Sequence, residues 1–225
     1  VNGIMEYLEK NVEINNIASE RIFGDTRYET SYKIFESGWI NSDSAILVSG
    51  LDYPDALCAA PLATKYNAPI LLTRNTSLAN QNELKNLLIS KGVKNVIIIG
   101  GQGVIPIEVE KELDSLGISN KRLGGSTRFE TSVLIANEVG IKNGEVILTS
   151  GRGFADGISI SAVAAAKGMP ILISEASSLP QVVRNYMNNN SIYKTYVIGG
   201  SGVLTESLAS TLKNPERLGG KDRYE

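Results

Sequence analysis

Short apolar runs alternate with longer segments of helical character along the whole chain. Continuous apolar runs occur at Ala45–Val48, Pro69–Leu72 and Val96–Ile99, and a polar residue or a glycine follows each of them. A run this short and this uniformly apolar indicates a strand that is buried on both faces. The remaining pattern predicts helices at 54–66, 81–91 and 106–116 and a short fourth strand at 121–123.

Strands that alternate with helices are typical of βαβ units, in which helices cover both faces of a mainly parallel sheet. The sequence of such a unit occurs twice here. The segment that starts at Arg21 recurs at Arg122 and begins again at Arg217, and the strands and turns between these points recur in the same order. Self-similarity of this kind indicates tandem units. We therefore predict an α/β protein with a first module at 21–121 and a second at 122–216, between the tail of a preceding unit at 1–20 and the start of a third at 217–225.

Each repeat carries a signal for the start of a helix. In a capping box, a Ser, Thr or Asp side chain and a glutamate three residues later satisfy backbone N–H groups at the helix start. The pattern occurs at Thr26/Glu29, Thr127/Glu130 and Asp222/Glu225. Helices are predicted to begin at these three places. In the first of them, aromatic residues share one face, at Tyr28, Tyr32 and Phe35.

The composition removes several classes of function. The chain has no histidine and one cysteine, Cys58, which excludes histidine-dependent triads and zinc sites, disulfides within the chain and thiolate metal clusters. The net charge of −2 argues against non-specific nucleic-acid binding. No apolar run approaches the ~18 residues of a membrane helix. We therefore expect no metal, no cofactor, no nucleic acid and no membrane span.

Arginine is concentrated in the repeated motif. Six of the nine arginines lie there, and Arg27, Arg128 and Arg223 occupy the expected first position of a helix. A cation at this position opposes the helix dipole, so its recurrence predicts an anionic partner for each arginine. Two partners remain open. One is a carboxylate of the protein itself, and the other is an anionic ligand held by the guanidinium fork and the helix N–H groups.

Two other repeated features have both a structural and a functional interpretation. Asp55 and Asp156 follow a strand and start a helix, where they either compensate the helix dipole or act as acids at the carboxyl end of a parallel sheet. The turns at Gly100–Gly103 and Gly199–Gly202 are either tight connections or phosphate cradles. For both features the structural interpretation is favoured.

The combination of motifs resembles the cell-wall-binding repeat type 2 family of Gram-positive surface-layer and cell-wall proteins, especially clostridial ones. The resemblance is carried by Arg27–Ser31, Tyr53–Leu57, Ala60–Ala63, Pro69–Leu72 and the Ile-Gly-Gly turns. It implies Toprim-like modules that usually occur in threes, packed around a pseudo-threefold axis. It also implies a secreted protein that is anchored at the cell surface by non-covalent binding of an anionic secondary cell-wall polymer.

The resemblance further implies which residues support anchoring. The Pro-Ile-Leu-Leu motif that the family associates with this role maps to Pro69, Ile70, Leu71 and Leu72 and, with one change, to Pro170, Ile171, Leu172 and Ile173. An apolar strand does not itself hold a charged polymer, so we expect it to position the loop that follows. In that loop Arg74 is a candidate polymer contact in the first module, whereas Glu175 would repel an anion in the second.

Three functional hypotheses follow. The leading one is a non-catalytic anchor that binds an anionic cell-wall glycopolymer through several individually weak contacts, with Arg27, Arg74, Arg128 and Arg223 among them. The alternative is an enzyme that acts on phosphorylated or sugar substrates, with the two repeated aspartates as acids. The third is a spacer that assembles a surface layer through contacts with neighbouring surface-layer proteins.

Overall fold

The structure, a computed structural model, describes residues 20–51 and 54–220. Over this part the chain forms two four-stranded sheets in which every pair of neighbouring strands is parallel. The first sheet has the order β2-β1-β3-β4, and its strands are β1 (Ser44–Ser49), β2 (Ile70–Thr73), β3 (Asn95–Ile99) and β4 (Ser119–Leu123). The second repeats this order as β6-β5-β7-β8, and its strands are β5 (Glu145–Ser150), β6 (Ile171–Ser174), β7 (Lys194–Ile198) and β8 (Pro215–Leu218). The predicted α/β class with two tandem modules is confirmed.

Helices connect the strands of both sheets. Those of the first module are α2 (Arg27–Gly38), α3 (Pro54–Leu57), α4 (Ala59–Tyr66), α5 (Asn82–Ser90) and α6 (Ile107–Ser115), with a short 3-10 turn at Leu78–Asn80. Those of the second are α7 (Arg128–Val139), α8 (Phe154–Lys167), α9 (Gln181–Asn189) and α10 (Glu206–Ala209). The fourth strand of each sheet crosses the module boundary expected from the repeats, and the expected flanking units at 1–20 and 217–225 lie almost entirely outside the described residues.

The prediction of one continuous helix at 54–66 is wrong, because the segment forms two helices that are interrupted at Cys58. The physical reason is Pro61. A proline inside a helix has no N–H to donate four residues back, and its ring clashes with the carbonyl at that position, which is Leu57. The second module has Ala162 in place of this proline, and there α8 runs without interruption.

The predicted capping boxes are present at both described helix starts. In α2 the Thr26 hydroxyl accepts a hydrogen bond from the Glu29 N–H at 3.2 Å, and the Glu29 carboxylate accepts one from the Asp25 N–H at 2.7 Å. In α7 the same pair of bonds joins Thr127, Glu130 and Ser126 at the same distances. The third expected box, at Asp222 and Glu225, lies outside the described residues.

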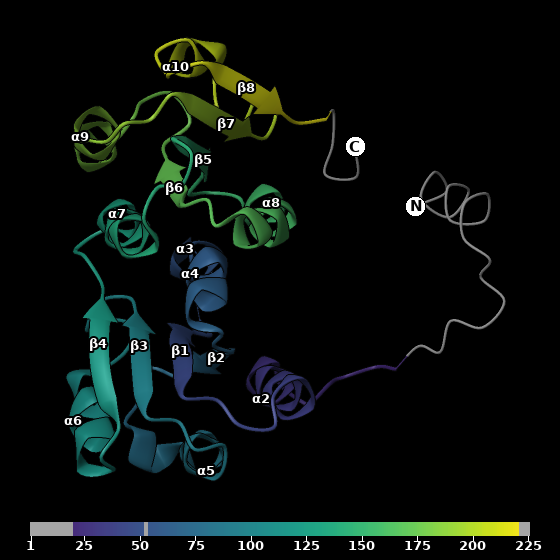
Figure 1. Cartoon of the computed structure of the whole chain (residues 1–225), viewed down its shortest axis with the longest axis vertical. Helices are drawn as coiled ribbons and strands as arrows, with labels where there is room; N and C mark the ends of the chain where they lie inside the picture. The colour runs from purple at the N-terminus through teal and green to yellow at the C-terminus, as the bar shows by residue number, and fades with distance from the viewer. Residues whose placement is uncertain (1–19, 52–53, 221–225) are drawn as a thin grey trace, which may run out of the picture.

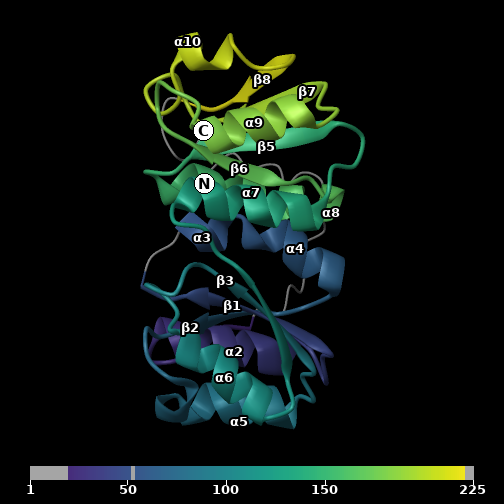
Figure 2. The same ribbon diagram turned by 90° about the vertical axis from the view of Figure 1, so that its left-hand side faces the viewer.

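The two sheets face each other across a shared layer of helices, in which α3 and α4 of the first module lie against α7 and α8 of the second (Figures 1 and 2). On its opposite face the first sheet is covered by α2, α5 and α6. The opposite face of the second sheet packs against α9, α10 and part of α7. The chain therefore forms a stack of alternating helical and sheet layers.

One hydrophobic core belongs to both modules. It contains Ile46 and Leu62 from the first module and Ile135, Ile147 and Ala164 from the second, all of them almost completely buried. Burial of apolar surface stabilises a fold by roughly 25 cal/mol per Å². Each module therefore depends on the other for part of its stability, and the pair behaves as one packed unit.

Candidate functional site

Two of the arginines singled out in the sequence begin helices, as predicted, and both hold the end of a neighbouring strand. The Arg27 guanidinium donates a hydrogen bond to the Gly50 carbonyl oxygen at 2.9 Å, and Arg128 donates to that of Gly151 at 2.6 Å. These carbonyls directly follow β1 and β5. Each arginine therefore has a partly negative acceptor within its own module, while the Arg27 side chain stays exposed to solvent.

Arg74 of the first module is connected to Arg27 indirectly, through Tyr28 and Gly50. Its guanidinium carbon is 4.1 Å from the centre of the Tyr28 ring, which is a stacked cation–π arrangement. Gly50 lies against the same ring, because a Cβ on Gly50 would be 2.4 Å from Tyr28 Cε1. The glycine thus lets the end of β1, whose following carbonyl accepts from Arg27, approach the ring on which Arg74 lies, and both arginines are exposed.

The apolar motif before Arg74 forms β2 and supports this arrangement from within. Leu71 is fully buried, Pro69 is buried, and Ile70 and Leu72 are half-buried. The strand is held by α2: the Tyr32 hydroxyl donates to the Leu72 carbonyl at 3.1 Å. Burial raises the pKa of Tyr32 to about 12, so the hydroxyl remains a donor at neutral pH.

The equivalent motif of the second module is still more deeply enclosed. Its four residues, which are Pro170, Ile171, Leu172 and Ile173, are all buried. The strand β6 that they form is paired in parallel with β5 in the register that joins Ser150 to Ser174. In the second module the motif is thus enclosed throughout, whereas in the first module Ile70 and Leu72 remain half-buried.

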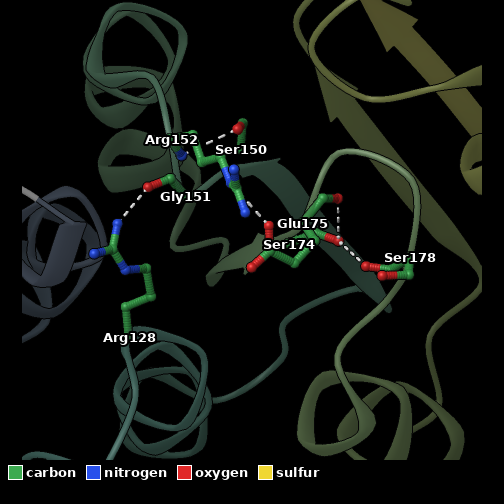
Figure 3. A network of polar contacts seen from close by, with 7 residues as sticks. All are labelled: Arg128, Ser150, Gly151, Arg152, Ser174, Glu175 and Ser178. Atoms are coloured by element: carbon green, nitrogen blue, oxygen red, sulfur yellow. Dashed lines mark hydrogen bonds and ion pairs between the residues drawn. The ribbon is translucent and has the colours of Figure 1, made fainter.

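The second module carries a different set of charges at the corresponding place. A cavity of about 460 Å³ is lined by Arg128, Phe129, Gly151, Arg152 and Glu175. In Figure 3, Arg128 reaches toward Gly151 while Arg152 reaches toward Glu175, and the Arg152 Nε to Glu175 Oε2 distance is 3.0 Å. The Ser150 hydroxyl accepts a hydrogen bond from the Arg152 N–H, and the Ser174 hydroxyl donates one to the Glu175 carbonyl. One of the two arginines here is thus engaged by a carboxylate that the first module replaces with Arg74.

The third arginine of the series, Arg223, lies outside the described residues. Two other repeated arginines, Arg122 and Arg217, stabilise turns. Arg122 donates to the Gly100 carbonyl at 2.7 Å and forms an ion pair with Glu110, and Arg217 donates to the Gly199 carbonyl at 2.7 Å. These contacts fix the glycine turns that follow β3 and β7.

The glycine turns are tight connections, as favoured from the sequence. Gly100 has φ +115° and Gly199 has φ +108°, a backbone conformation in which glycine is strongly preferred. Asp55 and Asp156 lie in the first turns of α3 and α8, where a carboxylate is favourable for the helix dipole, and each carboxylate lies against the glycine of its own module. Within the described ranges, no group of three or more Cys, Asp or Glu side chains is arranged to hold a metal ion.

Sequence reasoning missed a cavity that residues of both modules line. This junction cleft has a volume of about 660 Å³ and lies where the two modules meet. Its walls include Asp55, the turn at 101–104, Arg122, the loop at 124–127 and Arg128. The available signal was positional, because the cleft follows the carboxyl ends of β1 and β3, where ligands bind in open α/β sheets.

Comparison with known proteins assigns the family. The model for cell wall binding domain 2 matches residues 21–110 and again residues 122–209. The chain belongs to the cell wall binding domain 2 family. It is a tandem cell wall binding unit, and the family assignment places it at the cell surface. No helix in the described residues is long and apolar enough to cross a membrane.

Solved and curated relatives agree with this assignment. Cwp8 from Clostridium difficile is 28% identical with a TM-score of 0.80, over 99% of this chain and 39% of that one. Cwp6 from the same organism is also 28% identical with a TM-score of 0.80, over 94% of this chain and 36% of that one. The N-acetylmuramoyl-L-alanine amidase LytC of Bacillus subtilis is 35% identical over 92% of this chain and 41% of its own length. The chain thus spans less than half of each of these relatives.

Proposed function

We propose that this chain is a non-catalytic anchor that binds an anionic cell-wall glycopolymer non-covalently through arginines at the carboxyl ends of its strands. The family assignment supports cell wall binding, and the arginine arrangement supports a negatively charged ligand. The amidase activity in the name of LytC belongs to a protein of which this chain covers 41%. In this proposal the chain contributes attachment and no bond-breaking step.

The observation that carries the proposal is that Arg27 and Arg74 are both exposed and are connected through Gly50 and Tyr28; we call them the arginine pair. The stacking on Tyr28 reduces the freedom of the Arg74 side chain, so less entropy is lost when an anion binds. A guanidinium fork matches the oxygens of a phosphate or a carboxylate in two parallel hydrogen bonds. Two such forks in one module suit a chain that carries repeated negative groups.

The second module offers a weaker version of the same site. Arg128 lines the cavity there, but Arg152 is already paired with Glu175. Binding through several modest sites increases the overall affinity because the first contact raises the effective concentration of the polymer at the next. We therefore expect the first module to dominate binding and the second to add avidity.

The proposal is tested with Arg74→Gln on purified walls of Bacillus subtilis and Clostridium difficile. Arg74 is the appropriate target because its side chain is exposed and stacks on a ring, whereas Arg27 and Arg128 also hold strand ends. We expect retention on the walls to fall about 5- to 30-fold, which corresponds to the loss of one or two charge-assisted hydrogen bonds. We also expect retention of the unaltered chain to fall as salt is raised.

The matched control is Arg184→Gln. Arg184 is an exposed arginine of α9, so this variant has the same net charge but keeps the arginine pair. Equal retention of the two variants, or retention that is indifferent both to salt and to removal of the anionic polymer from the walls, would contradict the proposal. Thermal unfolding of both variants shows whether a loss of binding reflects a loss of fold.

A further inference from the structure

The junction cleft is built by both modules. The first module contributes Ser49, Asp55 and the turn at 101–104, and the second contributes the loop at 124–127 and the start of α7. The cleft lies beyond the carboxyl ends of β1 and β3, which are neighbours in the sheet. From β1 the chain continues to β2 on one side, and from β3 it continues to β4 on the other side. This is the topological switch point, the usual place for a ligand in an open parallel sheet. Neither module encloses the cleft alone.

The contact that shapes the cleft is a property of the repeat. A Cβ on Gly124 would be 2.3 Å from the Gly100 carbonyl oxygen, so only glycine permits the two turns to touch. In the second module, a Cβ on Gly219 would be 2.6 Å from the Gly199 carbonyl carbon. The same close approach of two glycines therefore forms at both places, which shows that this contact is a feature of the repeat.

The charges of the cleft distinguish it from the arginine pair of the first module. Its lining contains two guanidinium groups, Arg122 and Arg128, and two carboxylates, Asp55 and Glu130. Arg122 is also paired with Glu110. Because the charges of the lining balance, a polyanion gains little net attraction here, and its negative groups would meet two carboxylates. Arg27 and Arg74 therefore remain the better site for anionic groups.

The same mixture of groups is well suited to sugar hydroxyls. A hydroxyl both donates and accepts, so carboxylates can accept its proton while guanidinium groups donate to its oxygen. Arg122 is one of the lining residues, and its Nη2 is buried and has no hydrogen-bond partner among the described residues. The volume of about 660 Å³ lies within the range of small-molecule pockets.

We propose that the junction cleft binds a neutral, hydroxyl-bearing sugar unit of the wall glycopolymer, while Arg27 and Arg74 hold the anionic groups of the same polymer. This assignment rests on the proposed function, because it places one part of that ligand. It makes the pair of modules the smallest unit that can bind the sugar. It also separates the two contributions by their response to salt, since a balanced site is little affected by screening.

The experiment uses the full chain and neutral oligosaccharides. The oligosaccharides come from walls that retain the chain, and they are made neutral by removing their phosphate groups and reducing their carboxyl groups. Titration is followed by NMR at the backbone amides of the two turns that line the cleft. We expect shifts at 101–104 and 124–127 that persist at high salt, and none there from inorganic polyphosphate. We expect Gln102→Trp, which fills the cleft from the first module, to weaken binding about tenfold.

Two further variants make the test decisive. Ser126→Trp fills the cleft from the second module and should weaken binding similarly; Gln102 and Ser126 are both exposed. Ser201→Trp, on the equivalent turn of the second module, is the matched control and should leave the shifts at 101–104 unchanged. Absence of shifts from the neutral sugar, or equal binding by Gln102→Trp and Ser201→Trp, would overturn the assignment.

The two proposals fail in different ways. Walls that do not retain the chain would contradict the proposed anchoring function before any sugar is prepared. Walls that retain the chain through Arg74, combined with neutral sugars that do not perturb the cleft, would leave the anchoring function in place and remove only the sugar site.

Discussion

The helix pair α3–α4 and the single helix α8 occupy the same place in the repeat but have opposite surroundings. Leu57 and Leu62 are 4% and 0% exposed, whereas their counterparts Ile158 and Val163 are 55% and 43% exposed. The reason is that α7 and α8 of the second module cover the α3–α4 side of the first, while no described segment covers this face of α8. An apolar face thus has a buried and an open version within one chain.

The difference shows that the two modules stabilise each other through a shared core and are not independent domains. The second module completes the core of the first and exposes the equivalent surface of its own. A third copy that packed on α8 as α8 packs on α4 would bury Ile158 and Val163 in the same way. The grouping in threes that the family resemblance implies stays a prediction.

The largest difference in the free energy of unfolding is expected between a substitution on the covered face and the same kind of substitution at its open counterpart. Leu57→Ala should lower the free energy of unfolding by about 2–5 kcal/mol, because it leaves a cavity between the modules. Ile158→Ala should change it by about 0.5 kcal/mol, because the side chain is more than half exposed. Urea unfolding of both variants measures the contrast.

Equal destabilisation by the two substitutions would break the comparison, since it would mean that the face of α8 is covered in solution. The comparison can also be sharpened. In a longer protein that supplies a third copy, Ile158→Ala should cost nearly as much as Leu57→Ala, and the two results together would locate the third copy on α8.

A smaller effect on stability is expected where α8 packs against α3. A Cβ on Gly157 would be 2.8 Å from Leu57 Cδ1. Gly157→Ala should therefore destabilise the chain by about 1 kcal/mol, because overpacking costs ~1–3 kcal/mol and the better helix propensity of alanine returns up to ~1 kcal/mol. The measurement is a double-mutant cycle with Leu57→Ala.

In that cycle the alanine at 57 removes the side chain that the new methyl group would meet. Gly157→Ala should therefore become neutral or stabilising in the Leu57→Ala background, since only the helix-propensity gain remains. Additive effects of the two substitutions would show that Leu57 and Gly157 do not meet across the interface.

Local features of the sequence were sufficient to predict much of the fold. The buried strands are continuous apolar runs, the helix starts carry their own caps at Thr26 and Thr127, and the repeat fixes the order of the elements. The break at Cys58 could also have been predicted, because the effect of Pro61 four residues back is local. The shared core could not, because the face of a helix that another module covers is not encoded in that helix's own periodicity.

The candidate site was predictable only in part for the same reason. The sequence indicated Arg27 and Arg128 through their recurrence, and Arg74 through its place after a strand. It did not indicate that strand-end carbonyls accept from Arg27 and Arg128, or that Tyr28 supports Arg74. The junction cleft was missed because its walls come from two modules, and their contact depends on how the modules pack.

The smallest expected effect concerns polar contacts on the covered side. Glu138 of α7 accepts hydrogen bonds on its carboxylate from the Tyr66 hydroxyl and from Lys121, and Lys65 donates to its backbone carbonyl. The bonds from Lys121 and Tyr66 lower the pKa of the Glu138 carboxyl below its usual value. At the positions of α8 that correspond to Lys65 and Tyr66, Ala166 and Lys167 are exposed.

A carboxyl whose pKa is depressed in the folded state adds stability above its unfolded pKa of about 4.3, and this stability is lost as the pH falls through the lower folded pKa. Glu138→Gln should therefore lower the free energy of unfolding at pH 7 by about 0.5–1 kcal/mol, because the ion pair lies near the surface. The difference from the unaltered chain should shrink as the pH falls below 4.3, while Glu36→Gln, an exposed glutamate on α2, should show no such dependence. Chemical unfolding at a series of pH values measures both variants. A Glu138→Gln deficit that persists unchanged in acid would show that the contact between α4 and α7 depends on packing alone, and that the covered and open faces differ only in their apolar residues.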